Sequence, residues 1–123
     1  MKRYGFPKSA HLLRSVDYRK VYAEGRRRNL DWVVAFSLST GKPVSRLGLT
    51  VPASFGPAVE RNRVKRRLRE AARKHWPELG TGWDIVLQPR RSALLLEFAR
   101  MEGAVQKLFQ SCARWGQDRG LES

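Results

Sequence analysis

The segment from Arg61 to Lys74 constrains the fold of this 123-residue chain most strongly, because it carries eight Lys or Arg and one acidic residue. Wound as a helix at about 100° per residue, it gathers its apolar side chains on one narrow stripe. That stripe has spacings of four, three and four and consists of Val64, Leu68, Ala71 and His75. The pattern predicts a helix that docks on a core by this stripe and turns a wide cationic surface outward.

The charge balance of the whole chain extends this prediction. The 25 Lys and Arg exceed the 11 Asp and Glu, for a formal net charge of +14. Such a surplus favours a polyanionic partner, with nucleic acid first and a membrane surface second. A solvated basic face is the ordinary interpretation of a charge run, but too few acids are interspersed here to neutralise it. No segment has the length and apolarity to span a bilayer, so we expect no membrane partner.

Compartment signals are few but consistent with one another. Residues 1–7 lack the apolar run and cleavage site of a secretory signal. Cys112 is the single cysteine, so the chain can form no intrachain disulfide. We therefore expect a cytoplasmic protein in which Cys112 serves as a small packing residue.

Hydrophobic periodicity and turn residues predict an α+β fold in the order α-β-β-α-β-α, a small two-layer sandwich forming a single domain over residues 1–123. A basic extended arm (1–14) precedes it and a frayed tail (116–123) follows. Residues 25–29 are interpreted as a basic connector, and a short turn then joins the first two strands as an antiparallel hairpin. Pro77 should stop the basic helix. The expected helices are 15–23, 59–76 and 98–115, and the expected strands are 30–39, 46–51 and 83–88.

Catalytic chemistry is not evident in the sequence. The acids are scattered, and no two form a D-x-D or E-x-x-E pair for a metal or for acid–base work. His11 and His75 have no partner at ligand spacing, and His75 falls on the apolar stripe, where we interpret it as a packed histidine. We predict a binding protein with no catalytic residue of its own, no metal site and no organic cofactor.

Two tyrosines give a second candidate site. Tyr18 and Tyr22 are four residues apart and share one face of the first helix. They either pack in the core or present their rings at a cleft, and spacing does not separate these alternatives.

The run Arg61-Asn62-Arg63-Val64-Lys65-Arg66 resembles the RNR signature of the bacterial ribonuclease P protein subunit. Its surroundings agree: residues 47–51 resemble the strand before the family's loop, and residues 56–59 resemble its G-x-A-V entry to the helix. Residues 17–22 followed by Gly25 resemble its first helix. The resemblance covers roughly residues 12–112 in the family's order.

The resemblance implies the accessory subunit of a ribonucleoprotein endoribonuclease. Such a subunit binds ribonuclease P RNA, which cleaves precursor tRNA to give the mature 5′ end with Mg²⁺ held mainly by RNA; no obligate protein partner is evident. A left-handed βαβ crossover around the basic helix is also implied. The residues implied for the catalytic RNA are Arg61, Asn62, Arg63, Lys65, Arg66, Arg67, Arg69 and Arg73. Those implied for a cleft holding the 5′ leader are Tyr18, Tyr22 and Phe36.

One departure from the family pattern lies in the loop before the helix. The family has Ser-Lys-Lys and a later Asn where this chain has Pro52-Ala53-Ser54 and Pro57. Two loop cations are therefore absent, and Arg46, Arg90, Arg91 and the N-terminal arm are the candidates to replace them. Two alternative functions stay open: an rRNA-binding structural protein, and a DNA-binding regulator using the basic helix. The second lacks a short helix–turn partner.

Overall fold

The central strand, β4 (Trp83–Pro89), organises the sheet. Six of its seven residues are buried, because its apolar run is covered on both faces. It pairs antiparallel with β2 (Val33–Ser39) and parallel with β3 (Arg46–Leu49). β1 (Arg26–Asn29) pairs antiparallel with β2 and completes the strand order β1-β2-β4-β3.

The structure is a computed structural model that describes residues 10–12 and 14–122, with side chains through residue 115. Three α-helices and two short 3₁₀ helices flank the strands in the described part of the chain. They are α1 (Ser15–Glu24), η2 (Ala53–Phe55), α2 (Ala58–Leu79), η3 (Arg91–Leu95) and α3 (Phe98–Glu122).

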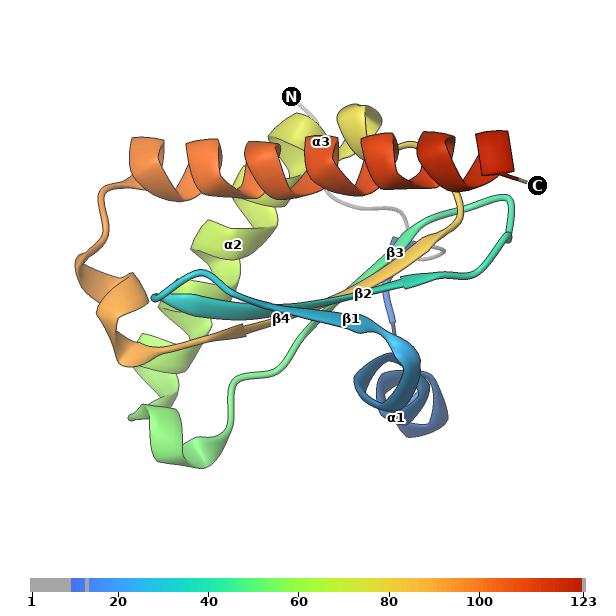
Figure 1. The fold of residues 1–123 in the computed structure, drawn as a ribbon. Coiled ribbons are helices and arrows are strands. Elements are labelled where there is room, and N and C mark those ends of the chain that lie inside the picture. The colour runs from blue at the N-terminus through green and yellow to red at the C-terminus, as the bar shows by residue number, and fades with distance from the viewer. Residues whose placement is uncertain (1–9, 13, 123) are drawn as a thin grey trace, which may run out of the picture.

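The helices cover the two faces of the sheet unequally. α2 and α3 lie on one face and α1 lies on the other (Figure 1). The larger core fills the space under α2 and α3 and includes Leu68, Ile85 and Phe109. A smaller core under α1 is built on Val21 and Val86, with the predicted aromatic residues packed around it. The α+β class is confirmed, and α1 adds a partial third layer to the predicted two-layer sandwich.

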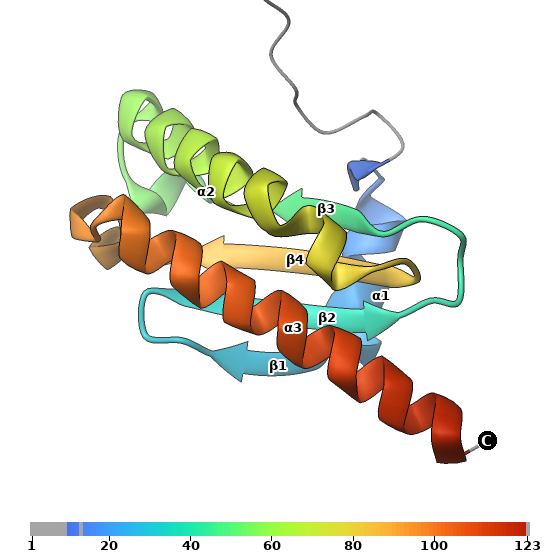
Figure 2. The same ribbon diagram turned by 90° about the horizontal axis from the view of Figure 1, so that it is seen from above.

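The connection from β3 through α2 to β4 is left-handed. Figure 2 views the sheet from the side of α2 and α3, with β3 and β4 pointing left and β4 below β3. Turned so that these strands point up, β4 lies to the left of β3 with α2 in front, the opposite of the usual crossover. The handedness implied by the resemblance is confirmed.

Two sequence predictions about the strands are wrong. Residues 26–29 are an edge strand, where we expected a connector, so the observed order is α-β-β-β-α-β-α. β2 and β3 do not form a hairpin, because β4 lies between them. β4 takes the position between β2 and β3, where six of its seven residues are buried because both faces of the sheet are covered there.

Both long helices also exceed their predicted ends. α2 continues through Pro77 to Leu79, which is 1% exposed, and ends at Gly80 with φ +80°. Burial of Leu79 compensates for the hydrogen bond that the proline removes. α3 passes Trp115 and is helical in its backbone to Glu122, so the segment expected to fray is helical in this structure.

The end of the N-terminal arm lies against β3. Leu12 is buried, and its N–H donates to the carbonyl of Leu47 at 3.0 Å. His11 forms an isolated parallel bridge to the same residue. Residues 1–9 and 13 of the predicted arm lie outside the described residues.

Candidate nucleic-acid interface

The cationic surface of α2 has the predicted design. Val64 and Leu68 are fully buried, which fixes the opposite side of the helix toward solvent. The Nε of Arg61 is buried and has no hydrogen-bond partner among the described residues. The predicted RNA-binding residues that are exposed are Asn62, Arg63, Arg66 and Arg69, and the half-buried ones are Arg61, Lys65, Arg67 and Arg73.

Two of these cations have partners within the protein. The guanidinium of Arg67 donates to the carbonyls of Ala93, at 2.9 Å, and Leu96. Arg73 forms an ion pair with Glu70 at 2.5 Å. Arg67 therefore anchors η3 to α2, and a role of either arginine toward RNA stays a prediction.

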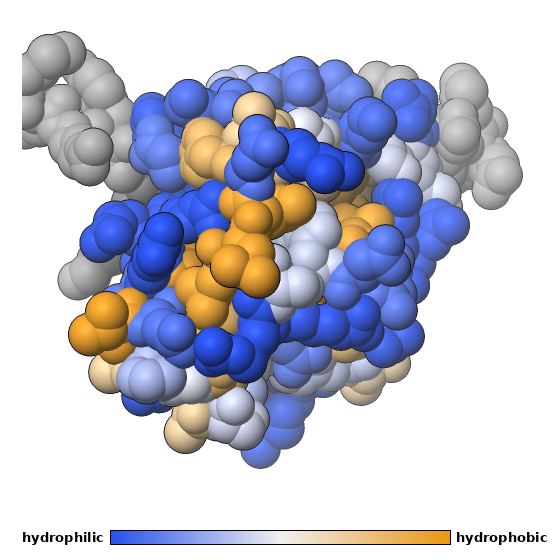
Figure 3. Space-filling model, turned by 90° about the vertical axis from the view of Figure 1, so that its left-hand side faces the viewer, coloured by the Kyte–Doolittle hydropathy of each residue, from blue (hydrophilic) through white to orange (hydrophobic). Residues whose placement is uncertain are grey.

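An apolar band crosses the end of the molecule that carries η2, η3 and the beginnings of α2 and α3 (Figure 3). Leu95 of η3 is 90% exposed, and Val59 at the start of α2 is 79% exposed. A pocket of about 330 Å³ beside η3 is lined by Leu94, Leu95, Arg63 and their neighbours. The RNR segment thus borders an apolar surface.

Tyr18, Tyr22 and Phe36 lie together on the α1 face of the sheet, and their role toward a leader stays a prediction. The rings of Tyr22 and Phe36 pack edge to face with centroids 4.9 Å apart. The hydroxyls of Tyr22 and Thr50 are hydrogen-bonded at 2.5 Å. All three aromatic residues pack against the smaller core and stay half-exposed. The three rings therefore pack against a core and also stay partly exposed.

Gly48 lets the ring of Tyr18 lie directly on the sheet. A Cβ at Gly48 would lie 2.7 Å from the Tyr18 hydroxyl, closer than van der Waals contact. The Tyr18 hydroxyl donates to the carbonyl of Leu12 at 3.2 Å. Burial raises the pKa of Tyr18, so its hydroxyl stays a neutral donor.

An ion-pair bridge holds α1 on the sheet beside these rings. Arg46 of β3 donates through Nε and Nη2 to the carboxylate of Asp84, at 2.9 and 2.6 Å. Its Nη1 also reaches Asp17 of α1 at 3.4 Å. The hydrogen bond to Asp84 raises the pKa of Arg46 against the effect of burial. Sequence reasoning missed this role, since it depends on residues that are far apart in the chain.

The arginines considered as replacements for the missing loop cations have different surroundings. Arg46 forms ion pairs with its two aspartates. Arg90 donates to the side chain of Asn29 and to the carbonyl of Asp31. Arg91 is the one that reaches the loop, where it donates to the carbonyl of Phe55 at 2.6 Å and pairs with Glu60 at 2.8 Å.

The cationic helix and the aromatic face meet at a small pocket of about 160 Å³. Its walls come from the N-terminal segment, α1, β3 and α2. They consist of His11, Leu12, Tyr18, Leu47, Leu49, Lys65 and Arg69. Two predicted RNA-binding cations thus lie beside a predicted leader-binding ring, although the sequence separates them widely.

His75 lies between two carboxylates. Its Nδ1 is 2.6 Å from Glu78, and its Nε2 is 3.0 Å from Glu102 of α3. Burial disfavours the charged imidazole, but the hydrogen bonds to these carboxylates outweigh it and raise its pKa. The interpretation of His75 as a structural residue fits these contacts, which join α2 to α3.

No three metal-ligating side chains lie together within residues 10–12 and 14–115. In the same part of the chain, no helix combines the length and apolarity needed to cross a membrane.

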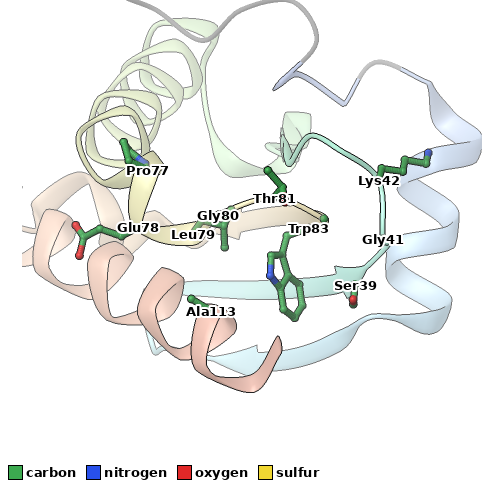
Figure 4. A pocket seen from close by; sticks show the side chains of 11 residues that line it. Ser39, Gly41, Lys42, Pro77, Glu78, Leu79, Gly80, Thr81, Trp83 and Ala113 are labelled. Atoms are coloured by element: carbon green, nitrogen blue, oxygen red, sulfur yellow. The ribbon is translucent and has the colours of Figure 1, made fainter. Parts of the chain in front are cut away.

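A larger pocket of about 510 Å³ lies away from both surfaces. It is enclosed by the end of α2, the loop of Gly41 and Lys42, and Ala113 of α3 (Figure 4). Lys42 is its single cation, and Trp83, its aromatic residue, is 3% exposed. Without a cationic cluster or an available ring face, this pocket lacks the features of a nucleic-acid site.

A family model named Ribonuclease P matches residues 6–113 of this chain. The chain belongs to the ribonuclease P protein family. The ribonuclease P protein component of Roseiflexus castenholzii is 35% identical over 105 residues, which cover 84% of this chain and 86% of that protein. The component of Desulforapulum autotrophicum is 32% identical over 114 residues, or 93% and 97% of the two chains.

Solved structures agree with this family assignment. The ribonuclease P protein of Thermotoga maritima matches with a TM-score of 0.72 and 29% identity, over 80% of this chain and 94% of that one. The protein of Staphylococcus aureus has a TM-score of 0.72 at 23% identity, over 81% and 92%. The second likeness supports the fold alone. The resemblance drawn from the RNR segment is confirmed.

Proposed function

We propose that this protein is the accessory subunit of the ribonuclease P ribonucleoprotein. In this proposal, α2 binds the catalytic RNA and the face of α1 and the sheet binds the 5′ leader of precursor tRNA. RNA carries out the cleavage with Mg²⁺ that it holds itself. The observation that supports this most strongly is the convergence of Tyr18, Lys65 and Arg69 at one pocket, where the two surfaces meet.

Each surface suits a different kind of RNA contact. Arginine offers a planar fork of donors to phosphate, so a helix that exposes Arg63, Arg66 and Arg69 suits a folded RNA backbone. Half-exposed aromatic rings beside cations suit a single strand of variable sequence, because every base has a π face.

The deciding experiment adds the protein to its own ribonuclease P RNA at low Mg²⁺ and measures precursor tRNA cleavage. We expect strong stimulation that weakens with salt. If about six phosphates are neutralised, the affinity for RNA should fall by about three decades between 50 and 200 mM monovalent salt. Unstimulated cleavage would contradict the proposal. Copurification with ribosomal subunits and no response to the leader would favour an rRNA-binding protein instead.

A further inference from the structure

The three arginines of β1 point to different faces of the sheet. Arg28 donates through Nη1 to the hydroxyl of Ser111 in α3 at 3.0 Å. The guanidinium of Arg26 lies 6.0 Å from the ring centroid of Trp115, also in α3. Side chains alternate along a strand, so Arg27 between them points to the opposite face, which α1 partly covers.

The strand register places Arg27 in one row with the aromatic residues. Arg27 is opposite Phe36, Phe36 is opposite Val86, and Val86 is opposite Gly48. Phe36 packs against Tyr22, and Gly48 lies under Tyr18. Because cross-strand neighbours have Cβ atoms about 5 Å apart, the side chain of Arg27 begins beside that of Phe36.

Arg27 is available to a ligand. It is exposed, and within the described part of the chain it has neither an ion pair nor a side-chain hydrogen bond. Charged residues commonly protect an edge strand from pairing with other chains, and all three β1 arginines could do so. If protecting the edge were its only role, replacing Arg27 should affect RNA binding no more than replacing Arg26. Comparing the two replacements therefore tests for a second role of Arg27.

Cations therefore lie at both ends of the aromatic row. Lys65 and Arg69 stand beside Tyr18 at the β3 end, and Arg27 stands beside Phe36 at the β1 end. The row crosses three strand spacings, about 14 Å in all. This distance exceeds the length of one nucleotide, so only a longer leader would reach from one end of the row to the other.

We infer that Arg27 is a phosphate-binding residue at the β1 end of the leader site, so that the single strand crosses the strands of the sheet from Lys65 and Arg69 to Arg27. This inference rests on the proposed function and adds a direction and a length to it. A planar guanidinium at that end would bind a phosphate beyond the bases that stack on the rings. Arg27 should then matter only for leaders long enough to reach it.

The test uses the holoenzyme assembled from the full chain and its ribonuclease P RNA. Arg27→Gln is compared with Arg26→Gln, which removes the same charge from the same strand on the other face. Dissociation constants are measured for precursor tRNA with a long leader, with a one-nucleotide leader, and for mature tRNA. Thermal melting of both variants checks that the fold is intact.

Arg27→Gln should weaken binding of the long-leader precursor about five- to tenfold. It should also reduce the slope of log affinity against log salt concentration by about one. The other two RNAs should bind as before, and Arg26→Gln should change none of the three. Equal losses in the two variants, equal losses for all three RNAs, or no loss would overturn the inference. If the wild-type holoenzyme itself does not prefer precursor over mature tRNA, the proposed leader site fails as well.

Discussion

Gly48→Ala should separate leader binding from folding. The added Cβ would lie 2.7 Å from both Cε1 and the hydroxyl of Tyr18, whereas ordinary carbon contacts are about 3.5–4.0 Å. The ring must therefore move by about 1 Å. Since it is the far end of a side chain with two rotatable bonds, it can move without displacing the sheet.

The expected cost in stability is small. The hydrogen bond from Tyr18 to Leu12, already 3.2 Å long, would be lost at about 1 kcal/mol. Replacing a strand glycine returns about 0.5–1 kcal/mol of backbone entropy. The net change should be within about 1 kcal/mol, or about 4 °C in Tm.

The expected effect on RNA binding is larger. Displacing one ring from a base costs about 1–3 kcal/mol, which corresponds to about 5- to 150-fold in Kd. Fluorescence anisotropy with holoenzyme and labelled precursor or mature tRNA measures it. The loss should appear for the precursor alone.

Gly103→Ala is the matched control, because a Cβ there meets nothing within 4 Å. It should raise the free energy of unfolding by about 0.5–1 kcal/mol and leave both Kd values unchanged. A Gly48→Ala protein that binds precursor like wild type, or that loses precursor and mature tRNA equally, would refute the role of the Tyr18 ring.

The contacts of Arg67, His75 and Cys112 each lead to a testable expectation. Arg67→Ala should lose about 2–3 kcal/mol of stability, since two backbone carbonyls lose a charged donor. Arg66→Ala should instead melt like wild type and bind the catalytic RNA more weakly. The reverse pattern would contradict a structural role for Arg67 and an RNA-binding role for Arg66. Because contacts with Glu78 and Glu102 raise the pKa of folded His75 above its unfolded value near 6.5, its stabilisation is complete below that pH and is lost as pH rises through the folded pKa. Denaturant melts should show this loss, and His75→Gln should remove it. Cys112, 6% exposed with a pKa raised by burial, should react with a thiol reagent only upon unfolding, and fast labelling of native protein would be inconsistent.

Local patterns predicted the elements that bury an unbroken apolar stripe. Val64 and Leu68 are fully buried, as their helical spacing requires, and β4 is the strand that its apolar run predicts. β1 escaped prediction because three consecutive arginines show no apolar alternation. The order of the strands was not predicted, because β4 pairs with both β2 and β3 and such pairing depends on segments that are far apart in the chain.

The candidate site likewise has parts that local sequence patterns predicted and parts that they did not. The exposed cations of α2 follow from composition and helical period. The convergence of Tyr18, Tyr22 and Phe36 came from the family resemblance, because spacing alone left core packing and a cleft open. The inward role of Arg67 depends on carbonyls 26 and 29 residues away, which no local pattern reveals.

In the proposed function, the α1 face of the sheet holds the leader while α2 holds the catalytic RNA. Its most direct test replaces Phe36 by a photoreactive benzoylphenylalanine in the assembled holoenzyme and maps the crosslinked nucleotide. We expect crosslinks within the 5′ leader of precursor tRNA and none to mature tRNA. Crosslinks to the catalytic RNA or to the tRNA body would contradict it.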